Sequence, residues 1–148
     1  MIYIVFVNII LGHCQVPCGI YDDVLRIKQI KENYTTINKA MAKINELSGH
    51  TDALSKNQLN RWVSEKEKHA SKIQSIISNY FLTQRIKETN TKYLDQVTLL
   101  HKLLVVTMKC KQSIDTDNVE EGLKLIILFS EAYFDSHGLK HLNDISPK

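Results

Sequence analysis

Residues 22–47 read DDVLRIKQIKENYTTINKAMAKINEL, and apolar side chains recur in this segment at alternating intervals of three and four. Such intervals place side chains on one face of an α-helix. Asp22 or Asp23 is a suitable N-cap, and Gly49 supplies a stop after the helix. The segment therefore predicts an amphipathic helix that packs one face against other helices. That face consists of Ile27, Ile30, Tyr34, Ile37, Met41 and Ile44.

A second amphipathic helix is predicted after a loop at residues 50–54. Ser55 is followed three residues later by Gln58, which is the spacing of a capping box at a helix start. The charged residues 64–70 are most simply a solvated face with pairs four residues apart. Residues 83–91 are polar and predict a connection. The apolar face of this helix consists of Leu59, Trp62, Val63, Ala70, Ile73, Ile76, Ile77 and Tyr80.

A third helix is predicted to be apolar on more than one face. Its main face consists of Tyr93, Val97, Leu100, Leu104 and Thr107. The residues that widen this face are Leu99, Leu103, Val105, Val106 and Met108. A wide apolar surface indicates burial between helices and against another subunit. Near the end of this helix, Cys110 is expected to be a buried, inert thiol.

A fourth helix follows a turn at residues 115–118 and is predicted to end at Gly138. Its inward positions are Val119, Leu123, Ile126, Ile127, Ser130 and Tyr133. Together the four segments predict an all-α fold, an up-down four-helix bundle over residues 22–137. We expect the tail at residues 138–148 to be poorly ordered.

The composition sets limits on the class of protein. The chain has 148 residues, enough for one domain with a four-helix core, and 43% of them are hydrophobic. Its formal net charge of +3 is too small to indicate a nucleic-acid partner, and Lys and Arg alternate with Asp and Glu along the helices. No phosphate-binding glycine loop, His-Glu-x-x-His or Gly-x-Ser-x-Gly motif is present.

The segment before the bundle predicts a metal-binding hook. Residues 13–21 read HCQVPCGIY, so two cysteines, Cys14 and Cys18, stand four apart and His13 precedes the first. Pro17 restricts φ and Gly19 permits unusual backbone angles, which together favour a sharp loop. The cysteine spacing by itself leaves a short disulfide or two unrelated cysteines open.

A second place for a metal is weaker. Glu65 and His69 share one face of the second predicted helix, at a spacing of four residues. Such a pair is more simply part of the charged, solvated face.

As a whole, the nine residues 13–21 resemble the N-terminal signature of the nickel-containing superoxide dismutases. The Tyr80-Phe81 pair and the Lys109-Cys110-Lys111 run are also similar to segments of that family. The resemblance extends from His13 to about Phe134. It implies a nickel hook on a four-helix bundle that assembles as a homohexamer. It also implies an oxidoreductase that disproportionates superoxide to oxygen and hydrogen peroxide through a nickel(II)/nickel(III) cycle.

The resemblance further implies which residues act. Members of the family are cut before the histidine, which here means between Gly12 and His13, and the new α-amine becomes a nickel ligand. His13, Cys14 and Cys18 would supply the remaining donors to one nickel ion per subunit. Tyr21 would position the substrate beside the metal, and Tyr80 corresponds to the family's second tyrosine near the nickel site.

Four positions depart from the family's pattern. Gln15 stands where the family usually has aspartate, and Asp23 stands where a proline commonly follows Tyr-Asp. Gln29 and Glu65 align with the residues that support the axial histidine in some members. We expect these differences to change the tuning of the site more than its existence.

Residues 1–12 are apolar apart from Asn8, and no Lys or Arg precedes Arg26. The segment is too short to span a bilayer as a helix, so no stable membrane insertion is expected. It lacks the basic region of a secretory signal, which makes export the weaker interpretation. A pro-segment removed by a maturation protease fits better. Because nickel needs reduced thiolates, a cytoplasmic location is favoured.

Two other functions remain open from the sequence. The hook could bind nickel, copper or zinc without redox turnover, as in a metal-storage or sensing protein. Alternatively, the leader is never removed and the chain is a helical interaction module.

Overall fold

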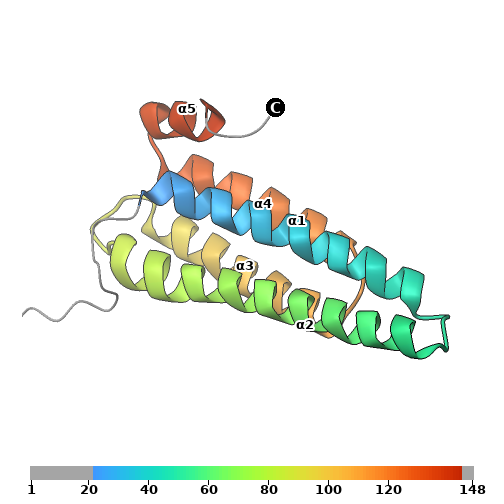
Figure 1. Cartoon of the computed structure of the whole chain (residues 1–148). Coiled ribbons are helices and arrows are strands. Elements are labelled where there is room, and N and C mark those ends of the chain that lie inside the picture. The colour runs from blue at the N-terminus through green and yellow to red at the C-terminus, as the bar shows by residue number, and fades with distance from the viewer. Residues whose placement is uncertain (1–21, 145–148) are drawn as a thin grey trace, which may run out of the picture.

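The computed structural model describes residues 22–144, which form five α-helices and one π-helix and contain no strand. The chain order is shown in Figure 1. No helix within residues 22–144 has both the length and the apolar character needed to cross a membrane. The elements are α1 (Asp23–Leu47), α2 (Ala53–Ser75), η1 (Ile76–Arg85), α3 (Tyr93–Gln112), α4 (Asp117–Tyr133) and α5 (Ser136–Asp144).

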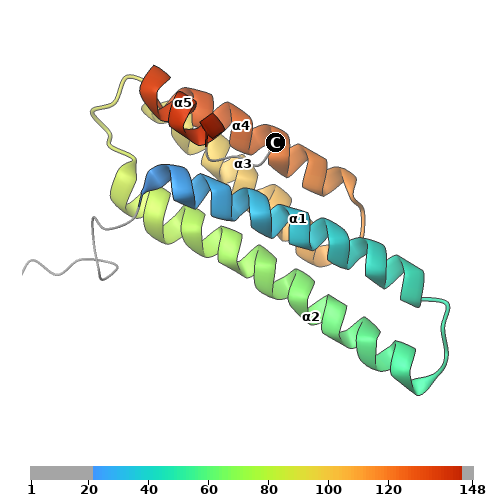
Figure 2. The ribbon, with the colours of Figure 1, turned by 45° about the horizontal axis from the view of Figure 1, so that its top comes forward.

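The four long helices run alternately up and down and enclose one core (Figures 1 and 2). α1 packs chiefly against α2, and α3 packs chiefly against α4, while α1 also meets α4 and α2 meets α3. The short α5 lies across the end of the bundle against α1. The predicted all-α helical bundle is therefore confirmed.

The start of α1 follows the sequence closely. Asp22 is the N-cap, and its Oδ1 accepts a hydrogen bond of 2.8 Å from the Val24 backbone N–H. The predicted apolar face of α1 is buried along its whole length. At α2 the predicted capping box is wrong. Asp52 is the N-cap, and its Oδ1 accepts a hydrogen bond of 2.9 Å from the Ser55 N–H.

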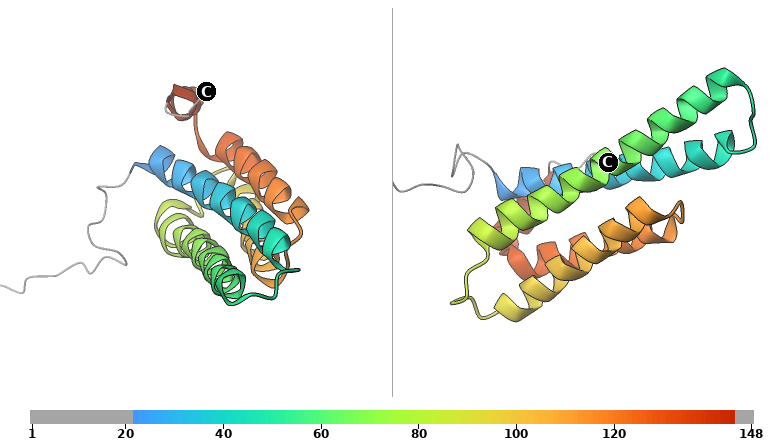
Figure 3. Two further views of the ribbon diagram at one scale, coloured as in Figure 1. Left: turned by 45° about the vertical axis from the view of Figure 1, so that its right-hand side comes forward. Right: turned by 90° about the horizontal axis from the view of Figure 1, so that it is seen from below.

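Two predicted core positions are wrong for reasons of geometry. The α1–α2 hairpin extends beyond the α3–α4 pair (Figure 3), and Val63, in the middle of α2 and three residues before the buried Lys66, is 39% exposed. In α4, Ile127 is 49% exposed, whereas Leu125 and Phe129 are buried. A step of one residue turns a side chain by roughly 100° around the helix, which carries Ile127 off the buried face of Ile126.

The second long helix continues where a connection is predicted. α2 passes into the π-helix η1, which ends only at Arg85, and so the expected connection at residues 83–91 is wrong for its first three residues. The Ile86 N–H donates 2.9 Å to the Phe81 carbonyl, five residues back. Thr83 Oγ1 and Gln84 Nε2 likewise donate to the carbonyls of Ser78 and Asn79. These polar side chains therefore extend the helix.

The C-terminal region is also more ordered than the sequence indicates. α4 ends at Tyr133 and not at Gly138, and residues 138–144 of the expected tail belong to α5. Asp135 Oδ1 accepts 2.8 Å from the Gly138 N–H, and Leu142 is buried. A Cβ at Gly138 would lie 2.7 Å from Phe134 Cδ1, so the glycine allows α5 to fold back over Phe134. Residues 145–148 lie outside the described residues.

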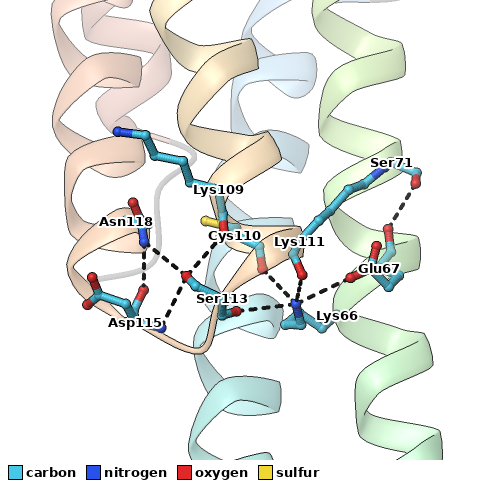
Figure 4. Close-up of polar contacts among 9 residues, drawn as sticks. All are labelled: Lys66, Glu67, Ser71, Lys109, Cys110, Lys111, Ser113, Asp115 and Asn118. Atoms are coloured by element: carbon cyan, nitrogen blue, oxygen red, sulfur yellow. Dashed lines mark hydrogen bonds and ion pairs between the residues drawn. The ribbon is translucent and has the colours of Figure 1, made fainter.

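Lys66 lies in the charged segment predicted to be solvated, yet its side chain is only 5% exposed. Its ammonium donates to three carbonyl groups at the end of α3: Cys110 at 2.8 Å, Ser113 at 3.3 Å and Lys111 (Figure 4). The last carbonyls of a helix have no partner within the helix and carry the negative end of its dipole. Lys66 thus fastens α2 to the end of α3, and the solvated-face prediction is wrong at this residue.

A close contact joins α1, α3 and α4 in the middle of the bundle. Thr107 Oγ1 donates 2.7 Å to the Leu103 carbonyl, so the Tyr34 hydroxyl donates to Thr107 at 2.7 Å. Gly122 faces the same ring, and a Cβ there would lie 2.5 Å from Tyr34 Cε1 and 2.6 Å from its hydroxyl oxygen. Only glycine permits α4 to approach this closely.

We predict that Gly122→Ala lowers the free energy of unfolding by about 1–3 kcal/mol, although alanine is intrinsically the better helix former by about 1 kcal/mol. The reason is that the buried Tyr34 ring has to move and disturb its bond to Thr107. Urea unfolding followed by circular dichroism measures the change. Glu121→Ala on the exposed neighbouring position is the control and should shift stability by less than about 0.5 kcal/mol. Equal or greater stability of Gly122→Ala than of the parent would contradict the packing argument.

Lys66→Met keeps most of the side-chain volume and removes the donors to the end of α3. We expect it to lower the free energy of unfolding by about 1–3 kcal/mol, since buried carbonyls are left without a partner. Lys68→Met, on a side chain that is 60% exposed, is the matched control and should be nearly neutral. Indistinguishable urea midpoints for the two variants would rule out the anchoring role of Lys66.

Candidate active site

The hook residues His13, Cys14, Cys18 and Tyr21 lie outside the described residues. The point where the hook joins the bundle is described, because Asp22 and Asp23 follow Tyr21 directly. Tyr80, the other candidate site residue, is described as well and lies in η1. The structure therefore shows what surrounds the base of the hook.

Three side chains that are distant in the sequence converge on the Asp23 carboxylate at this base. The Tyr80 hydroxyl donates to Oδ1, and the Tyr133 hydroxyl donates to Oδ2 at 2.7 Å. The Arg85 guanidinium donates to Oδ2 through Nη2 at 2.6 Å and through Nε at 3.1 Å. Asp23 is 14% exposed as a side chain. Its carboxylate thus joins the first turn of α1 to the ends of η1 and α4. We call these four residues the Asp23 cluster.

The π-helical turn is what brings Tyr80 and Arg85 to the same carboxylate. Residues five apart lie about 140° apart around an α-helix, at roughly 100° per residue. In a π-helix each backbone bond spans five residues, so side chains at that spacing lie nearly above one another. Tyr80 and Arg85 therefore both face Asp23.

The electrostatics of the cluster keep its phenols neutral. Burial raises the pKa of Tyr80 well above its ordinary value, and the hydrogen bond to Asp23 raises it further because ionisation would break that bond. Burial also raises the pKa of Tyr133 to about 12, again helped by Asp23. The hydrogen bond to Asp23 raises the pKa of Arg85. At physiological pH two neutral phenols and a guanidinium cation therefore surround the carboxylate.

Aromatic packing holds the Tyr80 ring in place. Tyr80 is only 3% exposed and lies edge-on to Phe81 with ring centres 5.2 Å apart. Phe81 in turn contacts Phe129 at 5.1 Å and Tyr133 at 5.6 Å in the same edge-on manner. The guanidinium carbon of Arg26 lies 5.1 Å from the Tyr80 ring centre. Tyr80 is therefore a rigid group next to the start of the bundle.

A polar cleft of about 540 Å³ lies between α1 and α2, and Arg26 connects it with Tyr80. Inside the cleft, Arg26 Nη1 donates 2.9 Å to Gln29 Oε1, and His69 Nδ1 lies 2.6 Å from Asn33 Oδ1. The Gln29 side chain thus holds Arg26 beside Tyr80.

Other metal-binding possibilities find little support in the described part of the chain. His69 Nε2 lies 3.3 Å from Glu65 Oε2, and burial, together with Lys72, lowers the pKa of His69. Within residues 22–144 no group of three or more His, Cys, Asp or Glu side chains is placed to hold a metal ion. Cys110 is a free, buried thiol, and burial raises its pKa to about 11. The burial expected for Cys110 is thus confirmed.

The Asp23 cluster is the part of the site that sequence reasoning missed. Asp23 looks like a helix cap, Arg85 falls in a predicted connection and Tyr133 looks like a core residue. Their sequence separations from Asp23 are 62 for Arg85 and 110 for Tyr133, so no local spacing relates them.

Comparison with known proteins identifies the family. A family model described as nickel-containing superoxide dismutase matches residues 8–137, which include the whole hook, η1 and the Asp23 cluster. No similar protein was found among curated proteins, and no similar chain among solved structures. Because the family model covers most of the chain, this protein belongs to the nickel-containing superoxide dismutases, a family of oxidoreductases.

Proposed function

We propose that this chain, cut between Gly12 and His13, binds one nickel ion per subunit through His13, Cys14 and Cys18. With that ion it disproportionates superoxide to oxygen and hydrogen peroxide. The observation that carries the proposal is the extent of the family match, which begins before the proposed cut and runs through all of the hook. The redox-silent metal protein and the uncleaved interaction module are the alternatives that the experiments below separate.

The donors in the hook suit nickel. Nickel(II) accepts square-planar sites of nitrogen and sulfur, and thiolates are soft ligands. Of the three cysteines in the chain, Cys14 and Cys18 lie in the hook. The third, Cys110, has a buried thiol with a pKa of about 11 and stays protonated at neutral pH. We therefore assign the pair of thiolates to Cys14 and Cys18, as the family resemblance implies.

Cleavage matters because it changes the chemistry of one nitrogen. While Gly12 is attached, the nitrogen of His13 is an amide with little basicity. After the cut it is an α-amine, whose lone pair is available to a metal. The leader thus acts as a block on the site until a maturation protease removes it.

When bound, nickel supplies the one-electron chemistry by alternating between its +2 and +3 states. Tyr21 and Tyr80 would position superoxide or water next to the hook, with Tyr80 held neutral by burial and by Asp23. Arg26 and Arg85, whose guanidinium carbons lie 5.1 and 5.8 Å from the Tyr80 ring centre, provide positive charge near an anionic substrate.

We further propose that the subunits assemble as a homohexamer. Supporting this, α3 and α4 expose large apolar side chains: Leu94 is 75% exposed, Ile127 and Leu128 are 49% exposed, and Met108 is 41% exposed. Apolar surface of this kind marks contact with a partner when it is contiguous. Leu128 and Leu99 line one groove between the two helices. The requirement for reduced thiolates favours assembly and loading in the cytoplasm.

The first test compares protein beginning at His13 with protein that retains residues 1–12. Both are loaded with nickel under reducing conditions, and bound nickel and superoxide consumption are measured on the same samples. We expect the His13 form to bind one nickel per subunit and to be active, and the longer form to bind nickel weakly and to lack activity. A His13 form that is fully loaded and inactive would instead support the redox-silent alternative. Recovery of only the uncleaved chain from its native host would support the interaction module.

The second test separates the hook thiols from Cys110. In the His13 form, Cys14→Ser and Cys18→Ser should each abolish activity and reduce nickel affinity by at least about tenfold, because a hydroxyl is a poor ligand for this metal. Cys110→Ala is the matched control, since it removes the third thiol from the core while leaving the hook intact. Nickel content after dialysis gives the comparison. If Cys110→Ala lost nickel as the hook variants do, the assignment of the ligands would be wrong.

A further inference from the structure

We propose that Asp23 is a positioning residue for this site, whose carboxylate fixes the Tyr80 hydroxyl in one orientation, as a hydrogen-bond donor, at the base of the hook. The inference rests on the proposed function, because it gives Asp23 a role in superoxide dismutation through Tyr80.

The position of Asp23 supports this role. Only Asp22 separates it from Tyr21, the last residue of the hook. Asp22 caps α1, and its Oδ2 lies 3.3 Å from His141 Nε2 of α5. The Asp22 side chain therefore contacts both α1 and α5. Asp23 therefore follows the last residue of the predicted hook by two positions in the sequence.

The two oxygens of Asp23 have different partners. Oδ1 accepts from Tyr80, while Oδ2 accepts from Arg85 and Tyr133. The three donors come from η1 and α4 and prevent the carboxylate from rotating. Because a carboxylate only accepts, the hydrogen of the Tyr80 hydroxyl has to point at Asp23.

This orientation determines what Tyr80 offers to its other neighbours. With its hydrogen directed to Asp23, the phenol oxygen faces further groups as an acceptor. Any further hydrogen bond to this oxygen is therefore one that it accepts. Asp23 thus determines which kind of group can bind to the Tyr80 oxygen.

Within the described residues 22–144, charged and titratable groups of α1, η1 and α4 face Tyr80. They are Asp23 and Arg26 of α1, Arg85 of η1 and Tyr133 of α4. Asp23 is the acidic member of this set. Its replacement by a neutral residue should therefore change the hydrogen bonding of Tyr80 more than a similar change nearby.

The experiment compares Asp23→Asn with Asp22→Asn, which makes the same change of charge one residue away and keeps a good N-cap. Tyrosine labelled with ¹³C at Cζ is introduced into metal-free His13 protein, and Tyr80→Phe identifies the Tyr80 signal. We expect Asp23→Asn to move the Tyr80 signal and Asp22→Asn to leave it in place. An unmoved Tyr80 signal in a folded Asp23→Asn protein would overturn the proposal. If Asp23→Asn does not fold, Asp23→Glu, which retains the carboxylate but moves it, takes its place.

Activity of the nickel-loaded protein gives the second readout. We expect Asp23→Asn to lower kcat/KM by about tenfold, as displaced positioning groups commonly do. In the Tyr80→Phe background the same substitution should cause little further loss, since the hydroxyl it acts through is gone. Equal losses in both backgrounds would show that Asp23 acts by another route.

The ¹³C measurement and the activity measurement distinguish failure of the Asp23 proposal from failure of the proposed dismutase function. A nickel-loaded parent protein without activity would contradict the proposed dismutase function. The ¹³C signal of the metal-free protein would still decide whether Asp23 orients Tyr80.

Discussion

The Asp23 carboxylate accepts hydrogen bonds from Tyr80, Tyr133 and Arg85, and this convergence joins the first turn of α1 to η1 and α4. Arg85 and Tyr133 are the last residues of η1 and α4, and Tyr80 lies five residues before Arg85, so small differences in helix length or phase would carry these donors out of reach. The π-helical turn aligns Tyr80 with Arg85, and the core around Phe81 and Phe129 fixes η1 against α4. The base of the site therefore depends on the packing of the whole bundle.

A second polar anchor acts toward the other end of the bundle. Lys66 of α2 binds the last carbonyls of α3, whereas the Asp23 cluster connects the start of α1 with η1 and α4 (Figures 1 and 4). Apolar packing is tolerant of small sliding movements between helices, but hydrogen bonds to buried groups are costly to lose. The two anchors thus limit sliding of the helices along the bundle axis. A site attached at one end of the bundle requires this restriction.

The sequence predicts the parts of this molecule that depend on local patterns. Periodicity identifies α1 from Ile27 to Ile44 and the all-α class, and the spacing of His13, Cys14 and Cys18 predicts the hook that the family match includes. It misplaces features that depend on tertiary contact. Lys66 looks solvated until α3 is placed beside it, and residues 138–144 look like a tail until Leu142 is buried. The Asp23 cluster is the clearest example, because its four residues can be recognised as a group only once the fold has brought them together.

Asp23 shows how one position can serve both a helix start and a polar cluster. Proline suits the first residue of a helix because its φ is preset and its missing N–H would have no partner there. Asp23 is that first residue of α1. An aspartate gives up the preset φ, but its negative charge is favourable at the positive end of the helix dipole. Aspartate is therefore nearly as suitable as proline at this helix start. Its carboxylate also accepts hydrogen bonds from Arg85 and two phenols, in the first turn of α1.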